Sequence, residues 1–245
     1  MASADRPGQR TPAPYDAQDR AHYEATRQVF QHSALHRGGY YDARPGRRLR
    51  HSAWQLRVRR IALSMLARDL RGRVPTRVVD VGCGRGDLAI EVATRFPRLA
   101  EVWGTDFVRE ALEIARAEAA RSPHVFFKEA DVLAMPFEDQ AFEAALCINV
   151  LHHVHPADLS RALDELARIT GRCLILEIKN RESFYYRHLR SRLAPPVGRI
   201  GIYPTSTGDV SAILAARGFR LAAEAGIFVI KRVSPLLVLM YERGR

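Results

Sequence analysis

Short apolar runs that alternate with amphipathic helices are the feature that most restricts the fold of this chain. Patterns typical of buried strands occupy 78–81, 101–106, 124–131, 142–150 and 173–178. Helical patterns with one apolar side separate them at 87–96, 108–120 and 156–170. Strands joined by helices of this length run parallel, and a parallel sheet is covered on both faces. We therefore expect an α/β fold with a doubly wound, mostly parallel sheet and helices on both faces.

The C-terminal part has a different pattern. A helix is predicted from about 207 to 217, where Gly218 suits a C-terminal cap. The apolar segments 219–229 and 235–243 follow each other with a short connection. Such a connection joins antiparallel strands, so we expect a C-terminal antiparallel hairpin at one edge of the sheet.

The N-terminal part is more polar. Residues 1–14 contain prolines and few apolar residues, which predicts disorder. Residues 15–73 are expected to form an N-terminal helical cap that includes an amphipathic helix at 53–71, with Trp54, Val58, Ile61 and Met65 on one side. The main domain is then expected at 74–245.

The net charge of +11 requires an explanation, and it is unevenly distributed. The segment 44–60 carries seven arginines and no acidic residue. It could attract nucleic acid, anionic lipid or an acidic substrate, or it could be a solvated helix face. The N-terminus lacks the apolar centre of a signal peptide, and three cysteines form neither a disulfide framework nor a zinc pattern. These features predict a cytoplasmic location.

The stretch VVDVGCGRGDLAI, residues 78–90, predicts a ligand-binding loop between a strand and a helix. It brings together Gly82, Gly84 and Gly86. A dinucleotide fingerprint would have its last glycine at position 87, which is Asp87 here, and Asp80 adds a second carboxylate that would repel phosphate groups. A ligand with positive charges and no phosphate, such as S-adenosylmethionine, turns both carboxylates into favourable contacts.

Two further acids end the next two predicted strands. Asp106 is placed to accept both hydroxyls of a ribose, although nicotinamide enzymes use an acid in the same way. Asp131 is placed to accept from an adenine amino group, with Val132 against the ring. A single acid at a strand end is usually a helix cap, but three on consecutive strands favour a binding site.

The motifs VVDVGCGRGDL, VWGTD and EADVLAMPFEDQAFEAALCINVLHHV together resemble class I S-adenosylmethionine-dependent methyltransferases, in the small-molecule branch similar to the ubiquinone and menaquinone biosynthesis enzymes. The resemblance covers about 74–180. It implies a Rossmann-like seven-stranded sheet with the hairpin at its edge, and a substrate-covering insertion at about 180–205. It also implies cofactor contacts from Asp80, Gly82, Cys83, Gly84, Gly86, Asp106, Phe107, Asp131, Val132 and Asn149.

Candidate catalytic groups follow the fourth predicted strand. Methyl transfer from a sulfonium is a direct displacement, and a base helps when the acceptor is a hydroxyl or an acidic carbon. His153 is the preferred base, because related small-molecule enzymes often have a histidine there, and His152 is then expected to face the helix or core. Packing remains an equal alternative for both residues. A zinc site from His152, His153 and His155 is not expected, because no further ligand completes a known spacing.

Aromatic residues from the two unmatched segments could cover the acceptor. The candidates for substrate contacts are Tyr40, Tyr41, Tyr185 and Tyr186, although aromatic residues on helices are more often core. Together with the arginines they predict O- or C-methylation of a small hydrophobic or aromatic metabolite with an acid group.

Several alternatives stay open. An RNA methyltransferase would explain the charge, but the strand before His152 lacks the Asn/Asp-Pro-Pro-aromatic signature, which makes nucleic acid an unlikely partner. A non-catalytic S-adenosylmethionine-binding protein would keep the same glycine loop. The segment 44–71 could contact a membrane peripherally, because it combines basic and apolar faces. The oligomeric state is not predicted.

Overall fold

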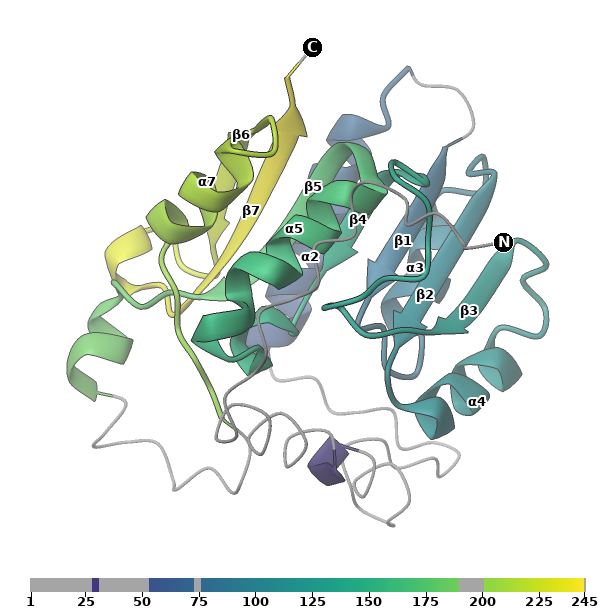
Figure 1. The fold of residues 1–245 in the computed structure, drawn as a ribbon, viewed down its shortest axis with the longest axis horizontal. Coiled ribbons are helices and arrows are strands. Elements are labelled where there is room, and N and C mark those ends of the chain that lie inside the picture. Colours follow the sequence, from purple (N-terminus) through teal and green to yellow (C-terminus); the bar gives the residue numbers. More distant parts are fainter. Residues whose placement is uncertain (1–27, 31–52, 73–75, 190–200, 245) are drawn as a thin grey trace, which may run out of the picture.

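A seven-stranded sheet runs through the molecule in the order β3-β2-β1-β4-β5-β7-β6 (Figure 1). The structure is a computed structural model that describes residues 28–30, 53–72, 76–189 and 201–244. The strands are β1 (Arg77–Val81), β2 (Glu101–Asp106), β3 (Val125–Glu129), β4 (Phe142–Cys147), β5 (Thr170–Lys179), β6 (Phe219–Gly226) and β7 (Leu236–Arg243). The first five strands are parallel, and β7 is antiparallel to both of its neighbours. The predicted doubly wound sheet and its terminal hairpin are confirmed.

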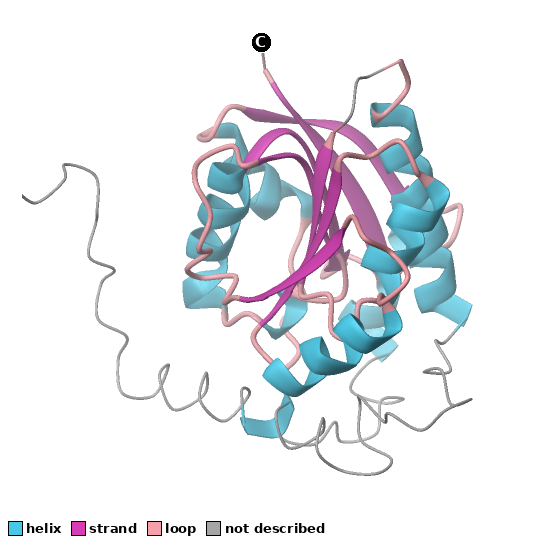
Figure 2. Cartoon of the chain, turned by 90° about the vertical axis from the view of Figure 1, so that its right-hand side faces the viewer, coloured by secondary structure: helices cyan, strands magenta, loops and turns pink. Residues whose placement is uncertain are grey.

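Helices cover both faces of the sheet (Figure 2). Apolar residues of α2 (Ala53–Asp69) and α3 (Asp87–Arg95) join one face of the sheet in a single core cluster. Those of α5 (Leu159–Ile169) and α7 (Thr207–Ala215) join the other face. α4 (Arg109–Glu118) packs against β2 and β3. The strands of the sheet centre are buried on both sides, which explains their continuous apolar sequence.

The strand β4 ends at Cys147, three residues earlier than predicted. Asn149 has a left-handed backbone, with φ of 64°, and this conformation interrupts the extended chain. The short 3-10 helices η1 (Leu151–His153) and η2 (Pro156–Asp158) follow, so α5 begins at Leu159 and not at Pro156. The turn at Asn149 is what brings the histidines back over the end of the sheet.

The buried side of α2 agrees with the predicted one except at Trp54. Val58 and Met65 are buried as predicted, together with Ala62 and Leu66. Trp54 is 41% exposed and lies outside this buried side. The helix therefore packs on the sheet as part of the same core as α3, although the sequence assigns it to an N-terminal cap.

The C-terminal hairpin has a connection that lies at a particular end of the sheet. In the antiparallel register, Leu236 at the start of β7 pairs with Lys179 at the end of β5. The loop between β6 and β7, with the short helix η4 (Lys231–Val233), therefore lies at the edge where the parallel strands end. Within the expected insertion at about 180–205, the described residues form a short π-helical element, η3 (Tyr185–Leu189).

Candidate active site

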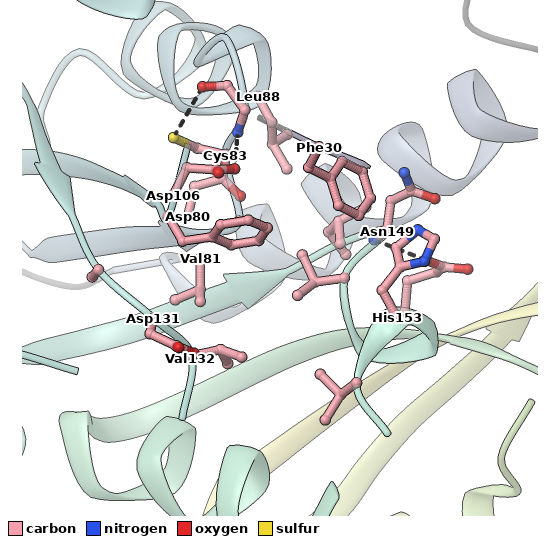
Figure 3. Close-up of a pocket in the computed structure, with 18 of the residues that line it drawn as sticks. Phe30, Asp80, Val81, Cys83, Leu88, Asp106, Asp131, Val132, Asn149 and His153 are labelled. Atoms are coloured by element: carbon pink, nitrogen blue, oxygen red, sulfur yellow. Dashed lines mark hydrogen bonds between the residues drawn. The ribbon is translucent and has the colours of Figure 1, made fainter. Parts of the chain in front are cut away.

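A cavity of about 210 Å³ opens at the carboxyl ends of β1, β2 and β4. The strand order reverses between β1 and β4, and such a switch point is where open α/β sheets bind their ligands. Figure 3 shows Asp80, Asp106 and Asp131 on one side of the cavity and Phe30, Asn149 and His153 on the other. The three acids predicted from separate strand ends therefore line one site.

The glycine loop after β1 is fixed by close packing. Gly82 has φ of 74°, and a Cβ atom there would lie 2.1 Å from a methyl carbon of Val150. The backbone N–H groups of Gly82 and Cys83 donate to the carbonyl of Thr105, at 2.7 and 2.8 Å. Gly82, Cys83 and Gly84 line the cavity. The loop thus brings bare backbone to the ligand space.

Gly86 corrects one predicted contact, because it is not among the cavity-lining residues. It has φ of 78° and precedes the first residue of α3. A Cβ atom at Gly86 would lie 2.7 Å from the ring of Phe127. This glycine is needed for the helix start and for packing against β3.

Asp106 holds the glycine loop to the start of α4. The carboxylate is 5% exposed, and its Oδ2 accepts from the N–H of Gly84 at 2.8 Å. Its Oδ1 accepts from the N–H of Val108 at 2.9 Å. Burial raises the pKa of this carboxyl, although the hydrogen bonds from Val108 and Gly84 oppose the rise. Asp106 is therefore both a structural clasp and a cavity-lining acceptor.

Asp80 is a buried acid, and one of its carboxylate oxygens has no hydrogen-bond donor among the described residues. It is 2% exposed, and no described residue hydrogen-bonds its Oδ2 atom. Burial raises the pKa of Asp80 to about 7; the cation of Arg59 lowers it, and the neighbouring charge of Asp106 raises it further. A positively charged ligand would stabilise the ionised form. The orphaned oxygen therefore fits a cationic ligand and disfavours a phosphate.

Asp131 and Val132 occupy the far end of the same cavity wall. Asp131 follows β3 by two residues, and its Oδ1 accepts from the N–H of Leu133 at 2.9 Å. Phe107, after β2, and Val132 also line the cavity. This side of the cavity offers an acidic acceptor together with apolar surfaces, as a flat heterocyclic ring requires.

The two histidines have different environments. His153 lines the cavity, and its Nδ1 atom lies 3.2 Å from the carbonyl oxygen of Gly201. Burial lowers the pKa of His153 to about 4, so the ring is neutral near pH 7. A carbonyl can only accept, so Nδ1 carries the proton and Nε2 is the acceptor nitrogen. The Phe30 ring packs edge-on against it at 5.1 Å.

His152 faces the interior, as expected if His153 faces the ligand. It is 4% exposed and is absent from the residues that line the cavity. Its Nδ1 lies 4.0 Å from a carboxylate oxygen of Glu177. Burial holds the pKa of His152 well below its usual value. This geometry favours packing over catalysis for His152, the second of the two catalytic candidates.

A buried ion pair completes the cavity, and sequence reasoning missed it. Lys179 Nζ lies 3.0 Å from Glu177 Oε1, and both residues line the cavity from the end of β5. Glu177 Oε2 accepts from the N–H of Asn149 at 2.8 Å. An acid and a base two residues apart on a strand point to the same face, and this was the signal available in LEIKN.

The aromatic residues that line the cavity differ from the tyrosines that were predicted to contact the substrate. Tyr40 and Tyr41 lie outside the described residues. Tyr185 and Tyr186 do not line the cavity, because η3 turns toward Trp54, with Tyr185 and Trp54 rings 6.3 Å apart. Phe30 lines it instead. Weak helical periodicity around Phe30 gave no reason to select it.

Part of the arginine-rich segment also belongs to the site. Arg59 lines the cavity, pairs with Glu91 at 2.5 Å and donates to the carbonyl of Asp87. It therefore joins α2 to α3 beside Asp80. Arg57 and Arg60 are exposed, as in a solvated helix face.

The fold and the site together define a class of protein: a Rossmann-like, seven-stranded methyltransferase fold with an acid-lined pocket that suits a positively charged nucleoside cofactor without phosphate. Residues 78–172 match the family described as "Methyltransferase domain". The chain is 35% identical over 172 residues to demethylmenaquinone methyltransferase of Thermus thermophilus, covering 65% of this chain and 77% of that protein. It is 33% identical to the Deinococcus radiodurans protein of the same name, covering 64% and 73%.

A solved structure agrees on the fold. Magnesium protoporphyrin IX methyltransferase from Synechocystis, with bound SAH, superposes with a TM-score of 0.62 at 22% identity, over 78% of this chain and 83% of that one. The chain belongs to the S-adenosylmethionine-dependent methyltransferases. Its cofactor, S-adenosylmethionine, supplies a methyl group on a positively charged sulfur. None of the described helices is long and apolar enough to cross a membrane.

Proposed function

We propose that this enzyme methylates an oxygen or carbon atom of a small hydrophobic or aromatic acceptor that carries an ionisable oxygen. In this proposal Asp80, the glycine loop and Asp106 hold the charged and ribose parts of the cofactor, and Asp131 with Val132 holds its base. The acceptor occupies the opposite side of the cavity. The transfer is a direct displacement, so alignment of the reactants and exclusion of water provide most of the catalysis.

The composition of the acceptor side carries this proposal. Phe30, Val150, Val154 and Leu236 provide apolar and aromatic surface, and Lys179 is the cation among them. The Lys179 ammonium donates to Glu177 and has further hydrogens to donate. A planar apolar molecule with an ionisable oxygen matches both features.

The similarity to quinone-modifying enzymes supports the same class of acceptor. Two relatives of more than 30% identity are named as demethylmenaquinone methyltransferases. The reduced form of a quinone ring is aromatic and carries two hydroxyl groups. We infer an acceptor of this general chemistry for this chain.

An acceptor panel tests the proposal. The purified protein and S-adenosylmethionine are incubated with a reduced demethylnaphthoquinone, an aromatic hydroxy acid, a cationic amine, a polar sugar and RNA. Mass spectrometry then measures the methylated product of each. We expect turnover on the first two classes. Product from only the amine, the sugar or RNA would contradict the proposal.

Lys179 is expected to determine the preference for ionisable oxygens. Lys179→Gln should lower kcat/KM for the best acidic acceptor about 10- to 100-fold, because a hydrogen bond from a charged donor is lost. Lys179→Arg should recover much of the loss. Lys128→Gln is the matched control, because Lys128 is a half-buried lysine that donates to the carbonyl of Pro136 and does not line the cavity. An unchanged kcat/KM in Lys179→Gln would remove Lys179 from the acceptor site.

His153 is expected to accept the proton of the acceptor hydroxyl through Nε2 as the methyl group arrives. His153→Ala should lower kcat about 10²-fold or more, as for loss of a general base. Because the pKa of His153 is lowered to about 4, the wild-type kcat should show no loss from its protonation down to about pH 5. His188→Ala, at an exposed histidine in η3, should be neutral. Near wild-type kcat in His153→Ala at every pH would leave His153 with packing alone.

A further inference from the structure

An exposed apolar surface, which the proposed reaction does not use, lies at the edge of the sheet where the cavity opens. The loop between β6 and β7 contains Phe228, Val229 and Ile230, which are 40%, 94% and 64% exposed. Three consecutive large apolar residues at a loop tip are unusual on a protein that has only water around it. Such a cluster indicates an interaction surface.

Two other segments extend this surface. The ring of Trp54, at the first turn of α2, lies 5.9 Å from the ring of Phe228 and 6.3 Å from that of Tyr185. Phe184, which precedes Tyr185, is 53% exposed. We call the combined surface the hairpin-tip patch; its exposed members are Trp54, Phe184, Phe228, Val229, Ile230 and Val233. Three segments far apart in sequence thus contribute to one patch.

Exposed cations accompany the hairpin-tip patch. Lys231 and Arg232 directly follow Ile230, Arg57 lies one helical turn after Trp54, and Arg187 belongs to η3. The acids of the same segments are Glu182 and Glu224, and Glu224 is paired with Lys231 at 2.8 Å. Apolar side chains next to an excess of cations suit a bilayer with anionic headgroups, where each cation near the surface contributes about 1 kcal/mol.

The hairpin-tip patch adjoins the cavity through shared elements. Leu236 lines the cavity and begins the strand that follows the loop, and Gln55 lines the cavity next to Trp54. The yellow loop before β7 and the lower end of α2 lie at the edge where the parallel strands end (Figure 1). Docking through this patch would therefore present the cavity toward the lipid.

We propose that the hairpin-tip patch is a membrane-docking surface, which inserts Phe228, Val229 and Ile230 among the headgroups of an anionic bilayer. The surface shares Trp54 and Arg57 with the basic segment at 44–71, but most of its exposed apolar residues come from the loop between β6 and β7. The apolar side of α2 is packed on the sheet through Val58 and Leu66, so it is not available for lipid. The patch goes beyond the proposed reaction and does not depend on which acceptor is methylated.

Vesicle co-sedimentation of the full chain, without acceptor, tests this proposal. Vesicles of phosphatidylcholine alone are compared with vesicles that also contain phosphatidylglycerol. The apolar variant is Val229→Ser/Ile230→Ser, with Leu221→Ser as its matched control, because Leu221 is 40% exposed toward the other end of β6. The charge variant is Arg232→Glu, matched by Arg98→Glu at an exposed arginine before β2.

We expect the wild type to bind the anionic vesicles, and both tip variants to bind the same vesicles at least about tenfold more weakly. Both control variants should bind as the wild type does. Equal binding by wild type and the double serine variant would overturn the proposal, as would an equal loss in Arg98→Glu, which indicates binding by net charge alone. Absence of wild-type binding to either kind of vesicle would also overturn the proposal. That result is the one expected if a protein partner, and not lipid, covers the patch. Since no methyl transfer is measured, these results stand apart from the acceptor panel.

Discussion

Asp106→Ala is expected to lower the affinity for S-adenosylmethionine by at least about 100-fold, because the charge-assisted contacts that we propose to the cofactor ribose and the geometry of the glycine loop would be lost together. The substitution leaves the N–H groups of Gly84 and Val108 without their acceptor. We therefore also expect the free energy of unfolding to fall by about 2–4 kcal/mol. Isothermal calorimetry and denaturant unfolding measure the two effects.

The matched control for Asp106 lies at the other end of the same strand. Glu101 accepts from Trp103 and Arg77, far from the cavity. Glu101→Gln should leave the cofactor affinity unchanged, whatever its effect on stability. Asp106→Asn keeps the size of the side chain but loses the charge and one acceptor oxygen, so we expect an intermediate affinity. Full affinity in Asp106→Ala would exclude Asp106 from the cofactor site.

Asp80→Asn is expected to move binding and stability in opposite directions. Burial raises the folded-state pKa of Asp80 from 3.8 to about 7, so the folded protein binds a proton that the unfolded chain releases between these values. The stability of the ligand-free wild type should therefore fall as pH rises from about 4 to 7, by as much as roughly 4 kcal/mol. Asparagine removes this cost, so the ligand-free variant should unfold at a higher temperature at pH 7.5.

The affinity for the cofactor should change with pH in the opposite sense. A cationic ligand favours ionised Asp80, so wild-type affinity should rise about tenfold per pH unit from pH 5.5 up to about 7 and then level off. Asp80→Asn should bind more weakly at pH 7 and show a flat profile. Calorimetry below pH 7.5 keeps the amino group of the ligand protonated. A steep profile that persists in Asp80→Asn would assign the titration to another group.

Much of the fold follows from local sequence patterns. The β2 segment EVWGTD was predicted to the residue, because apolar strands bounded by acids have clear ends. The β4 segment was overextended, since the left-handed turn at Asn149 has no glycine to announce it. Periodicity placed Trp54 on the buried side of α2, but in the structure its ring lies against Tyr185 and Phe228 and is 41% exposed, which the helical pattern alone could not show.

The residues of the candidate site also fall into those that the sequence could predict and those that it could not. Asp80, Asp106 and Asp131 could be predicted because each lies at or just past the carboxyl end of a strand whose direction is fixed by the parallel sheet. Glu177 and Lys179 lie at the end of β5, where the alternation in LEIKN was an available signal that the sequence analysis did not use. Phe30 could not be selected, because its approach to the cavity depends on how a distant segment folds over the sheet. Topology therefore predicts the residues at strand ends better than those that come from outside the sheet.

The carboxylate of Glu177 has a consequence for the order of events. One of its oxygens accepts from the N–H of Asn149, whose backbone is left-handed and which is a predicted cofactor contact, while the other pairs with Lys179, where the acceptor is expected. The Glu177 carboxylate thus contacts residues on both the expected cofactor side and the expected acceptor side of the cavity. An anionic acceptor that draws the Lys179 ammonium away from Glu177 should also disturb the turn at Asn149. We therefore expect the binding of either ligand to change the affinity for the other through Glu177.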